Sequence, residues 1–241
     1  MKKFYNSALV ACACALLAGC GKHVHQGYEA KKSLKSVGDL SVAHSTVSRV
    51  DAAGRADLHD VHVDGDCSVA GGTTLTRVTI GGTLRCAGSC AARDVRAHSI
   101  NLAGSADLRQ VVSDKGMSVR GDMTIADSTI HGQTNVRGGV LRADNTAFAD
   151  VVATVDKERD GKPVEFKLTQ STLDSLTIKN GASVSVLGMQ VNKPAKRQAW
   201  VVLDGTIVHG DIEFKDLQGT VVLRNNAQVT GNVLGGVISK Q

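Results

Sequence analysis

Large aromatic side chains and proline are scarce in this sequence. Its 241 residues include four Phe, two Tyr and one Trp, and only two Pro, against 26 Gly. Ordinary globular cores rely heavily on bulky aromatic side chains. The chain is therefore expected to bury its apolar surface in another way.

The sequence also lacks any segment in which charges of one sign are concentrated. The 28 Lys and Arg and the 23 Asp and Glu are spread along the chain, so we expect no nucleic-acid partner, because such a partner requires a gathered basic surface. The sequence also lacks a Ser-His-Asp pattern, a phosphate-binding loop and a dinucleotide fingerprint. Enzymes that carry these signatures are not indicated, and we expect no cofactor.

The N-terminal segment has the features of an export signal. Lys2 and Lys3 precede an apolar run that ends in Leu17-Ala18-Gly19-Cys20, and this run is too short to span a bilayer as a helix. The four-residue motif resembles the lipobox of bacterial lipoproteins. That resemblance implies that residues 1–19 are a signal peptide, that the Cys20 thiol receives a diacylglycerol, and that its new amine is acylated, for example by palmitate.

The same resemblance implies a location. In this family an acidic residue after the cysteine often retains the protein at the inner membrane, whereas here Gly21 follows. We therefore expect a lipid-anchored protein of the outer membrane, facing the periplasm or the exterior. Removing the signal leaves 26 basic against 23 acidic residues, a formal charge of +3. It also leaves three further cysteines in an oxidising compartment, Cys67, Cys86 and Cys90.

Glycines recur every 16 or 17 residues, and apolar residues recur with them. A fixed period of this size is typical of a solenoid. Two residues before successive glycines lie Val69, Cys86, Leu102, Val119 and Val136, and four residues after them lie Leu58, Leu75, Ala92, Leu108 and Ile125. The recurring glycines are Gly54, Gly71, Gly88, Gly104, Gly121 and Gly138.

Each period contains three short runs of alternating apolar and polar residues, which is the pattern of strands with one buried face. Three runs per period predict three sides, with the glycines at corners that require positive φ. We predict an all-β, single-stranded triangular β-solenoid of about ten rungs, with right-handed coiling as the expected hand. Stacked Val, Leu and Ile would fill its interior.

The repeat also predicts domain boundaries. Residues 20–39 lack the period and are expected to form a lipidated tether or cap, and residues 40–241 the solenoid. The motif returns at Gly188 and Gly205, and with Asn225 in place of glycine, which we expect at the same corner. Proline and charge clusters predict loop excursions near residues 156–163 and 192–198.

Two solenoid families bear comparison. Left-handed hexapeptide acyltransferases need an aliphatic residue every six positions, and the glycine spacing breaks that register. The rung length and the Gly-Asp pieces at Gly65-Asp66 and Gly121-Asp122 resemble bactofilin-like and adhesin-head β-solenoids. This resemblance implies an architecture and, from bactofilins, a capacity to assemble.

The densest polar cluster spans residues 57–66 and contains two His and four Asp. Two imidazoles and a carboxylate are a plausible ligand set for a divalent metal, which makes His59, Asp60 and His62 the alternative metal ligands. The repeat turns all three outward around a corner. We therefore expect a solvated corner and no metal here, and likewise none at His23 and His25 in the tether.

Carboxylates and arginines near one corner raise a second alternative, a carbohydrate-active enzyme. Outward acids and bases on adjacent rungs could deprotonate a sugar, although alternating charges on a solvated wall would look the same. A carbohydrate site usually presents exposed aromatic platforms, and the regular half of the chain offers only Phe148. The residues concerned are Asp60, Arg93, Asp94, Arg96, Asp107 and Arg109.

Cys86 and Cys90 flank Gly88 at equal distance, and both occupy inward columns. A disulfide across the corner is one expectation, and small buried thiols are the other. Cys67 lies one rung away and two residues out of step with Cys86, a Cα separation of ~8 Å, which is beyond disulfide reach.

Small residues just before the glycines indicate how the protein acts. Ala53, Ala70, Ala87 and Ala103 predict a flat outward strip that permits close lateral packing. We therefore expect a non-catalytic structural or binding module of the envelope, with another copy, an envelope protein or a glycan as partner. The alternatives are a polysaccharide or peptidoglycan lyase or hydrolase, and an adhesin head.

Overall fold

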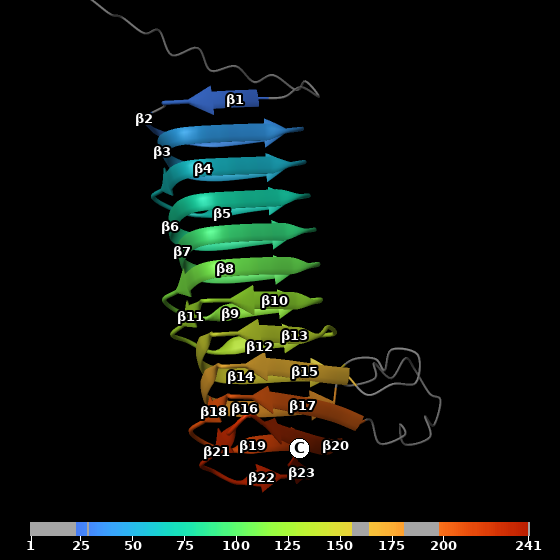
Figure 1. The fold of residues 1–241 in the computed structure, drawn as a ribbon. Coiled ribbons are helices and arrows are strands. Elements are labelled where there is room, and N and C mark those ends of the chain that lie inside the picture. The colour runs from blue at the N-terminus through green and yellow to red at the C-terminus, as the bar shows by residue number, and fades with distance from the viewer. Residues whose placement is uncertain (1–22, 28, 156–163, 181–197, 241) are drawn as a thin grey trace, which may run out of the picture.

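The computed structural model describes residues 23–27, 29–155, 164–180 and 198–240. These residues contain no helix, and their strands stack in about eleven turns of a β-solenoid (Figure 1). Strands of successive turns pair in parallel throughout the stack. The all-β solenoid predicted from the glycine repeat is thus confirmed, with one turn more than the ten expected.

The strands are β1 (His23–Gln26), β2 (Glu29–Val37), β3 (Leu40–Ala53), β4 (Ala56–Val63), β5 (Cys67–Ala70), β6 (Thr73–Ala87), β7 (Cys90–Ala103), β8 (Ala106–Ser113), β9 (Met117–Arg120), β10 (Met123–Ala126), β11 (Thr129–Ile130), β12 (Thr134–Arg137), β13 (Leu141–Asp144), β14 (Ala147–Val155), β15 (Val164–Thr169), β16 (Thr172–Asn180), β17 (Gln198–Asp204), β18 (Ile207–Val208), β19 (Ile212–Lys215), β20 (Gln218–Arg224), β21 (Gln228–Val229), β22 (Val233–Leu234) and β23 (Gly236–Lys240).

One regular turn, residues 73–88, shows the plan of the others. Its first face comprises residues 73–76, its second face residues 78–80 and its third face residues 83–87. The register of β6 against β7 breaks after Ile80 and resumes at Thr83, which marks the corner between the second and third faces. The other two corners lie at Arg77 and Gly88, where φ is positive.

The interior consists of stacked aliphatic columns. Leu58, Leu75, Ala92 and Leu108 pair in register on the first face, and all four are buried. Val69, Cys86, Leu102 and Val119 do the same on the third face. Like side chains therefore lie above like, which explains how the chain builds a core with few aromatic rings.

The glycine corner behaves as the repeat predicts. From Gly54 to Gly121 the five glycines of this column have φ between 130° and 147°, and Gly138 has φ 73°. Stacking adds a second requirement that the sequence did not reveal. A Cβ on Gly71 would overlap the carbonyl oxygen of Gly54, and one on Gly88 would overlap that of Gly71.

A second corner also has positive φ, and here the chain uses polar residues in most turns, with Gly205 as an exception. We call it the polar corner. Gly205 and Asn225 stack in this corner rather than in the glycine corner, because β15, β17 and β20 pair along the first face. The placement of these two residues at the glycine corner was therefore wrong. The other members are His44, Asp60, Arg77, Asp94, Gln110, Asp127, Asn145 and Gln170, with φ between 43° and 56°.

Buried hydroxyl groups support the polar corner in the C-terminal half. The backbone N–H of Val111 donates to Ser128 Oγ (2.9 Å), that of Thr146 to Ser171 Oγ (3.2 Å), and that of Ser171 to Thr206 Oγ1 (3.2 Å). Each hydroxyl also donates to a carbonyl two residues earlier. These side chains replace ladder hydrogen bonds that the sharp corner interrupts.

The Gly-Asp pieces have a defined structural role. The Asp66 carboxylate accepts the backbone N–H of Thr83 (2.8 Å), and the Asp122 carboxylate accepts that of Val140 (3.0 Å), in each case one turn further along the stack. A third Asp, Asp211, accepts the N–H of Asn232 (2.7 Å). These carboxylates therefore satisfy backbone donors at corners that the ladder leaves open.

The chain enters the stack earlier than the repeat indicated. β1 and β2, within the stretch expected to be a tether or cap, pair with β3 and form the first turn. Cys20, Gly188 and the loops expected near 156–163 and 192–198 lie outside the described residues, apart from Gln198, which begins β17. The described part of the chain contains no helix long and apolar enough to cross a membrane.

Candidate functional site

The four outward alanines stack directly above one another on the third face, beside the glycine corner. Backbone register pairs Ala53 with Ala70, Ala70 with Ala87, and Ala87 with Ala103. In the same column, Val37 lies one turn before the alanines. The alanine strip, as we call these four residues, is therefore a continuous surface.

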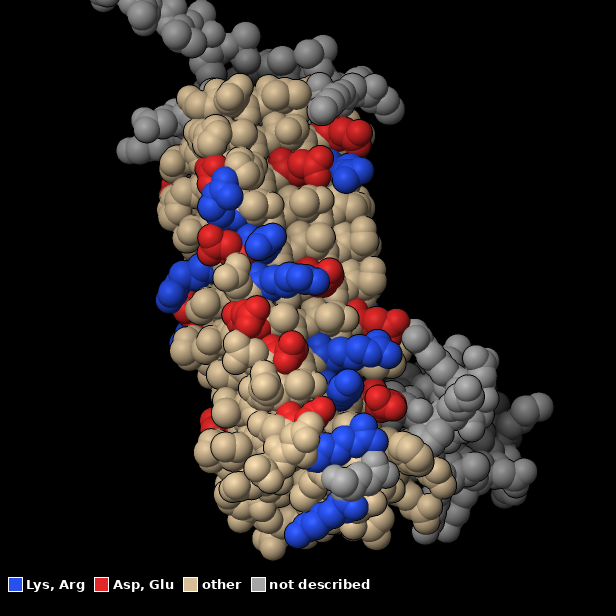
Figure 2. Space-filling view, viewed as in Figure 1, with Lys and Arg blue, Asp and Glu red and all other residues tan. Residues whose placement is uncertain are grey.

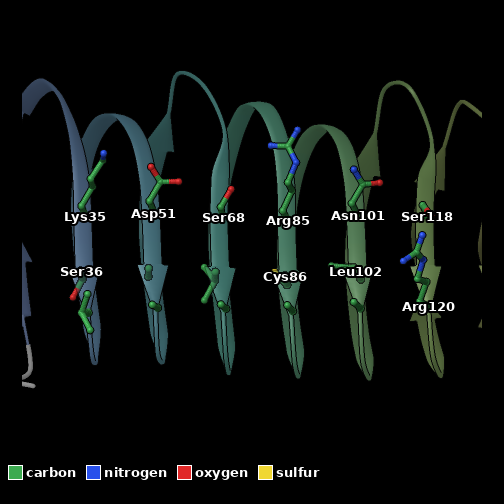
Figure 3. A pocket seen from close by; sticks show the side chains of 17 residues that line it. Lys35, Ser36, Asp51, Ser68, Arg85, Cys86, Asn101, Leu102, Ser118 and Arg120 are labelled. Atoms are coloured by element: carbon green, nitrogen blue, oxygen red, sulfur yellow. The ribbon is translucent and has the colours of Figure 1, made fainter.

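A column of larger side chains runs beside the alanine strip, two residues away along each strand. Figure 3 shows its members projecting side by side from successive turns. Together with the alanine strip they line an open groove of about 1070 Å³, with Arg120 at its far end. This polar column consists of Lys35, Asp51, Ser68, Arg85, Asn101 and Ser118.

The charges beside the groove are held by weak surface pairs. Arg85 Nη1 lies 2.8 Å from Asp66 Oδ2, and Arg49 Nε lies 3.0 Å from Asp51 Oδ2. Exposed pairs of this kind contribute about 0–1 kcal/mol each, so a partner could exchange them for its own contacts at little cost. A small apolar floor beside such side chains is suited to docking another surface.

A cluster of histidine and aspartate occupies the polar corner near the N-terminal end. His44 Nδ1 lies 3.3 Å and His59 Nε2 lies 3.0 Å from Asp60 Oδ2. The Arg77 guanidinium donates to His59 Nε2 (2.6 Å) and to Asp60 Oδ2 (2.9 Å). Through its hydrogen bonds to the carboxylate, Arg77 holds the pKa of Asp60 below its ordinary value of 3.8.

The structure brings together two of the three residues predicted as alternative metal ligands. His59 and Asp60 lie in the cluster, whereas His62 lies on the second face, where its Nε2 is 3.2 Å from Asp64 Oδ1. His44 was missed because it precedes Asp60 by 16 residues in the sequence. The period of the repeat was the signal that could have found it, because residues one period apart stack.

Four of the six residues named for a carbohydrate-active site take part in separate ion pairs. Asp60 pairs with Arg77, Arg96 pairs with Asp114 (2.7 Å), and Arg109 lies 3.7 Å from Asp107 within one strand. Lys and Arg are interspersed with Asp and Glu on the face seen in Figure 2. Phe148, considered as a platform for sugar, is buried, whereas Trp200 is 45% exposed.

The three cysteines of the described chain are buried, unbridged thiols. Cys67 pairs in register with Leu84, which confirms that it is two residues out of step with Cys86. Burial raises the pKa of the Cys67 thiol, and the hydrogen bond that Cys90 donates to Cys86, together with burial, raises the pKa of the Cys90 thiol. Raised pKa values keep the Cys67 and Cys90 thiols protonated and poorly nucleophilic, whereas the hydrogen bond from Cys90 lowers the pKa of Cys86.

Two surface features thus stand out in the described part of the chain, the groove on the third face and the histidine cluster at the polar corner. Both lie in the N-terminal half of the stack, and both are built from side chains one turn apart. No family model matches this chain, and no similar protein was found among curated proteins or solved structures.

Proposed function

We propose that this chain is a lipid-anchored β-solenoid of the bacterial outer membrane, attached through acylated Cys20, which acts as a non-catalytic structural or binding module. The groove on the third face is the observation that carries the proposal. Its floor of stacked methyl groups extends over four consecutive turns beside a polar edge. Small side chains at a contact surface allow a partner to approach closely and exclude water from a long strip.

A second copy of the chain fits the charge order of this groove. Two third faces can pack with a two-fold axis that runs parallel to the strands through the turn of Ala70, so that the turns of the two copies run in opposite order. Asp51 precedes this turn by one step and Arg85 follows it by one step. The axis therefore places Asp51 of each copy opposite Arg85 of the other.

The same axis makes the floor self-complementary. Ala70 would face Ala70 of the second copy, and Ala53 would face Ala87. Closed two-fold contacts of this kind are the commonest in soluble oligomers because one patch serves both partners. A dimer formed in this way buries the alanine strip. The glycine corners of the two copies then lie side by side along one edge of the contact surface.

Light scattering and negative-stain microscopy of protein that begins at Gly21 test the proposal, because lipid cannot then drive association. We expect dimers or larger assemblies. Ala70→Arg should abolish them by placing two cations on the axis. Asp51→Arg should weaken them, and adding Arg85→Asp to Asp51→Arg should restore them. Ala91→Arg, a matched change at an exposed alanine on the first face, should leave association unchanged.

A monomer at all concentrations would overturn self-association through the groove. The carbohydrate-active alternative would then be examined by glycan-binding and lyase assays, with the outward acids and arginines of the first face and polar corner as the residues to substitute.

A further inference from the structure

The polar corner near the N-terminal end gathers nitrogen and oxygen donors from adjacent turns. His44 comes from one turn and His59 and Asp60 from the next, and in-register stacking holds successive turns about 4.8 Å apart. His59 ends the first face of its turn and Asp60 forms the corner, with φ 54°. One metal-ligating atom of each residue lies within 4.8 Å of the others.

The spacing of these atoms suits a tetrahedral ion. With ligands at about 2.0–2.1 Å from zinc, neighbouring donor atoms in a tetrahedral site are separated by about 3.3 Å. His44 Nδ1 and Asp60 Oδ2 are 3.3 Å apart, and His59 Nε2 and Asp60 Oδ2 are 3.0 Å apart. The imidazole rings stand edge to face, at 84°, so small rotations can direct both nitrogens at one point beside the carboxylate.

A cationic side chain already uses these donors. The Arg77 guanidinium lies 2.6 Å from His59 Nε2 and 2.9 Å from Asp60 Oδ2. Because a guanidinium offers only donors, it competes with a metal ion for the same lone pairs. The Arg77 side chain is 50% exposed, and Asp94, one turn further along the corner, also attracts it electrostatically. Arg77 can therefore leave Asp60 and pair instead with Asp94, which carries the same negative charge as Asp60.

We propose that His44, His59 and Asp60 bind one divalent transition-metal ion of the zinc class, with Arg77 as an internal competitor for the site. Two imidazole nitrogens and one carboxylate oxygen favour this class over magnesium or calcium, which prefer oxygen ligands throughout. Three protein ligands leave the fourth tetrahedral position to water. Because the ligands come from two turns, the ion links adjacent turns of the stack.

Zinc titration of the full chain purified in detergent, with a competing chromophoric chelator, tests this site. We expect one Zn²⁺ per chain, weakened at least about tenfold by His44→Asn or His59→Thr. Arg77→Gln should instead tighten binding. The chain uses these same replacements in the same columns, Asn145 and Gln110 at the polar corner and Thr76 beside His59 on the next turn, so the variants should fold.

His62→Thr is the matched control, because His62 has its own carboxylate partner outside the cluster and Thr79 occupies its column one turn on. Binding should change less than about twofold in this variant. Co²⁺ provides a second readout, with the visible bands of a tetrahedral nitrogen and oxygen site and without the intense near-ultraviolet bands of thiolate ligands. Absence of binding, binding that survives both histidine substitutions, or looser binding in Arg77→Gln would overturn the proposal.

Discussion

At the scale of single residues, two kinds of positive φ explain why one corner uses glycine and the other uses polar residues. From Gly54 to Gly121 the glycine corner has φ of 130–147°, which is almost exclusive to glycine. The polar corner has φ of 43–56°, the left-handed region that Asn, Asp and His tolerate. Glycine is therefore required at the first corner and is optional at the second.

Gly88→Ala should lower the free energy of unfolding by at least about 1–3 kcal/mol, because alanine would be strained at φ 135° and its Cβ would overlap the Gly71 carbonyl oxygen. Gly72→Ala is the control. Its φ is not positive and the nearest atom to a Cβ there is 3.6 Å away, so it should be nearly neutral. Urea unfolding of both variants measures the difference, and equal effects would contradict this account of the corner.

Asp66→Ala should lower the free energy of unfolding at pH 7 by about 1–3 kcal/mol, because it leaves the Thr83 N–H without its acceptor. The N–H of Thr83 and then the Arg85 guanidinium hold the pKa of Asp66 below its ordinary value of 3.8. A carboxyl group whose pKa is lowered in the folded state stabilises the fold at pH values above its ordinary pKa. This stabilisation is lost as the pH falls through the folded-state pKa.

The difference in free energy of unfolding between Asp66→Ala and the unmodified chain should therefore become smaller below about pH 4. Urea unfolding at a series of pH values between 7 and 2 would show this. A difference that stays constant, or that widens in acid, would mean that the carboxylate does not act through its charged form.

At the scale of the structural elements, buried hydroxyls join consecutive turns at the polar corner. Thr206 Oγ1 accepts the N–H of Ser171 (3.2 Å) and donates to the carbonyl of Leu168 (2.9 Å), and its side chain is fully buried. The earlier turns have Val61, Val78, Val95 and Val111 in this column. The turn before Val61 has a hydroxyl in this column as well, Ser45, so the apolar form is confined to the four turns between Ser45 and Ser128.

Thr206→Val keeps the shape of the side chain and removes all of the hydroxyl's hydrogen bonds, including the one to the Asp204 carbonyl. We expect the free energy of unfolding to fall by about 1–3 kcal/mol, because the buried Ser171 N–H loses its acceptor. Thr172→Val, at an exposed position on β16, should change it by less than about 0.5 kcal/mol. Thermal unfolding followed by circular dichroism compares them, and a neutral Thr206→Val would show that the backbone finds another acceptor.

At the scale of the whole molecule, the proposed anchor and the groove belong to the same end of the stack. Cys20 precedes β1 by three residues, a reach of at most about 11 Å. A lipid on Cys20 would therefore hold the first turn close to the membrane surface. The groove begins in that turn, at Lys35 and Val37, and two copies on one membrane can form the two-fold contact with their stacks lying along its surface.

Cys20→Ala should abolish incorporation of labelled palmitate and release the protein from the membrane fraction. The lipobox resemblance predicts this outcome, since the thioether and the amide of the anchor both form on Cys20. Fractionation of cells that produce either form, with the inner and outer membranes separated by density, provides the measurement. Retention of the variant in the outer membrane would contradict anchoring through this residue.

The sequence by itself determined the solenoid, because stacking places residues one period apart in contact. The core residues therefore recur along the sequence at a fixed spacing. Leu58, Leu75 and Leu108 could be recognised as one inward column, and Ala53 to Ala103 as one outward strip, from spacing alone. The loss of the period at 156–163 predicts a loop for the same reason, and that prediction lies outside the described residues.

The tertiary structure alone decided which residues share a site. His44 lies beside His59 and Asp60, whereas His62 does not. The sharp corner at Asp60 separates them, because His44 and His59 lie at its edge and His62 lies on the next face. Gly205 lies in the polar corner because turns in the C-terminal half differ in length, which spacing along the chain cannot resolve. Local alternation determines which side chains point inward, whereas the lateral alignment of turns depends on how each corner bends the backbone.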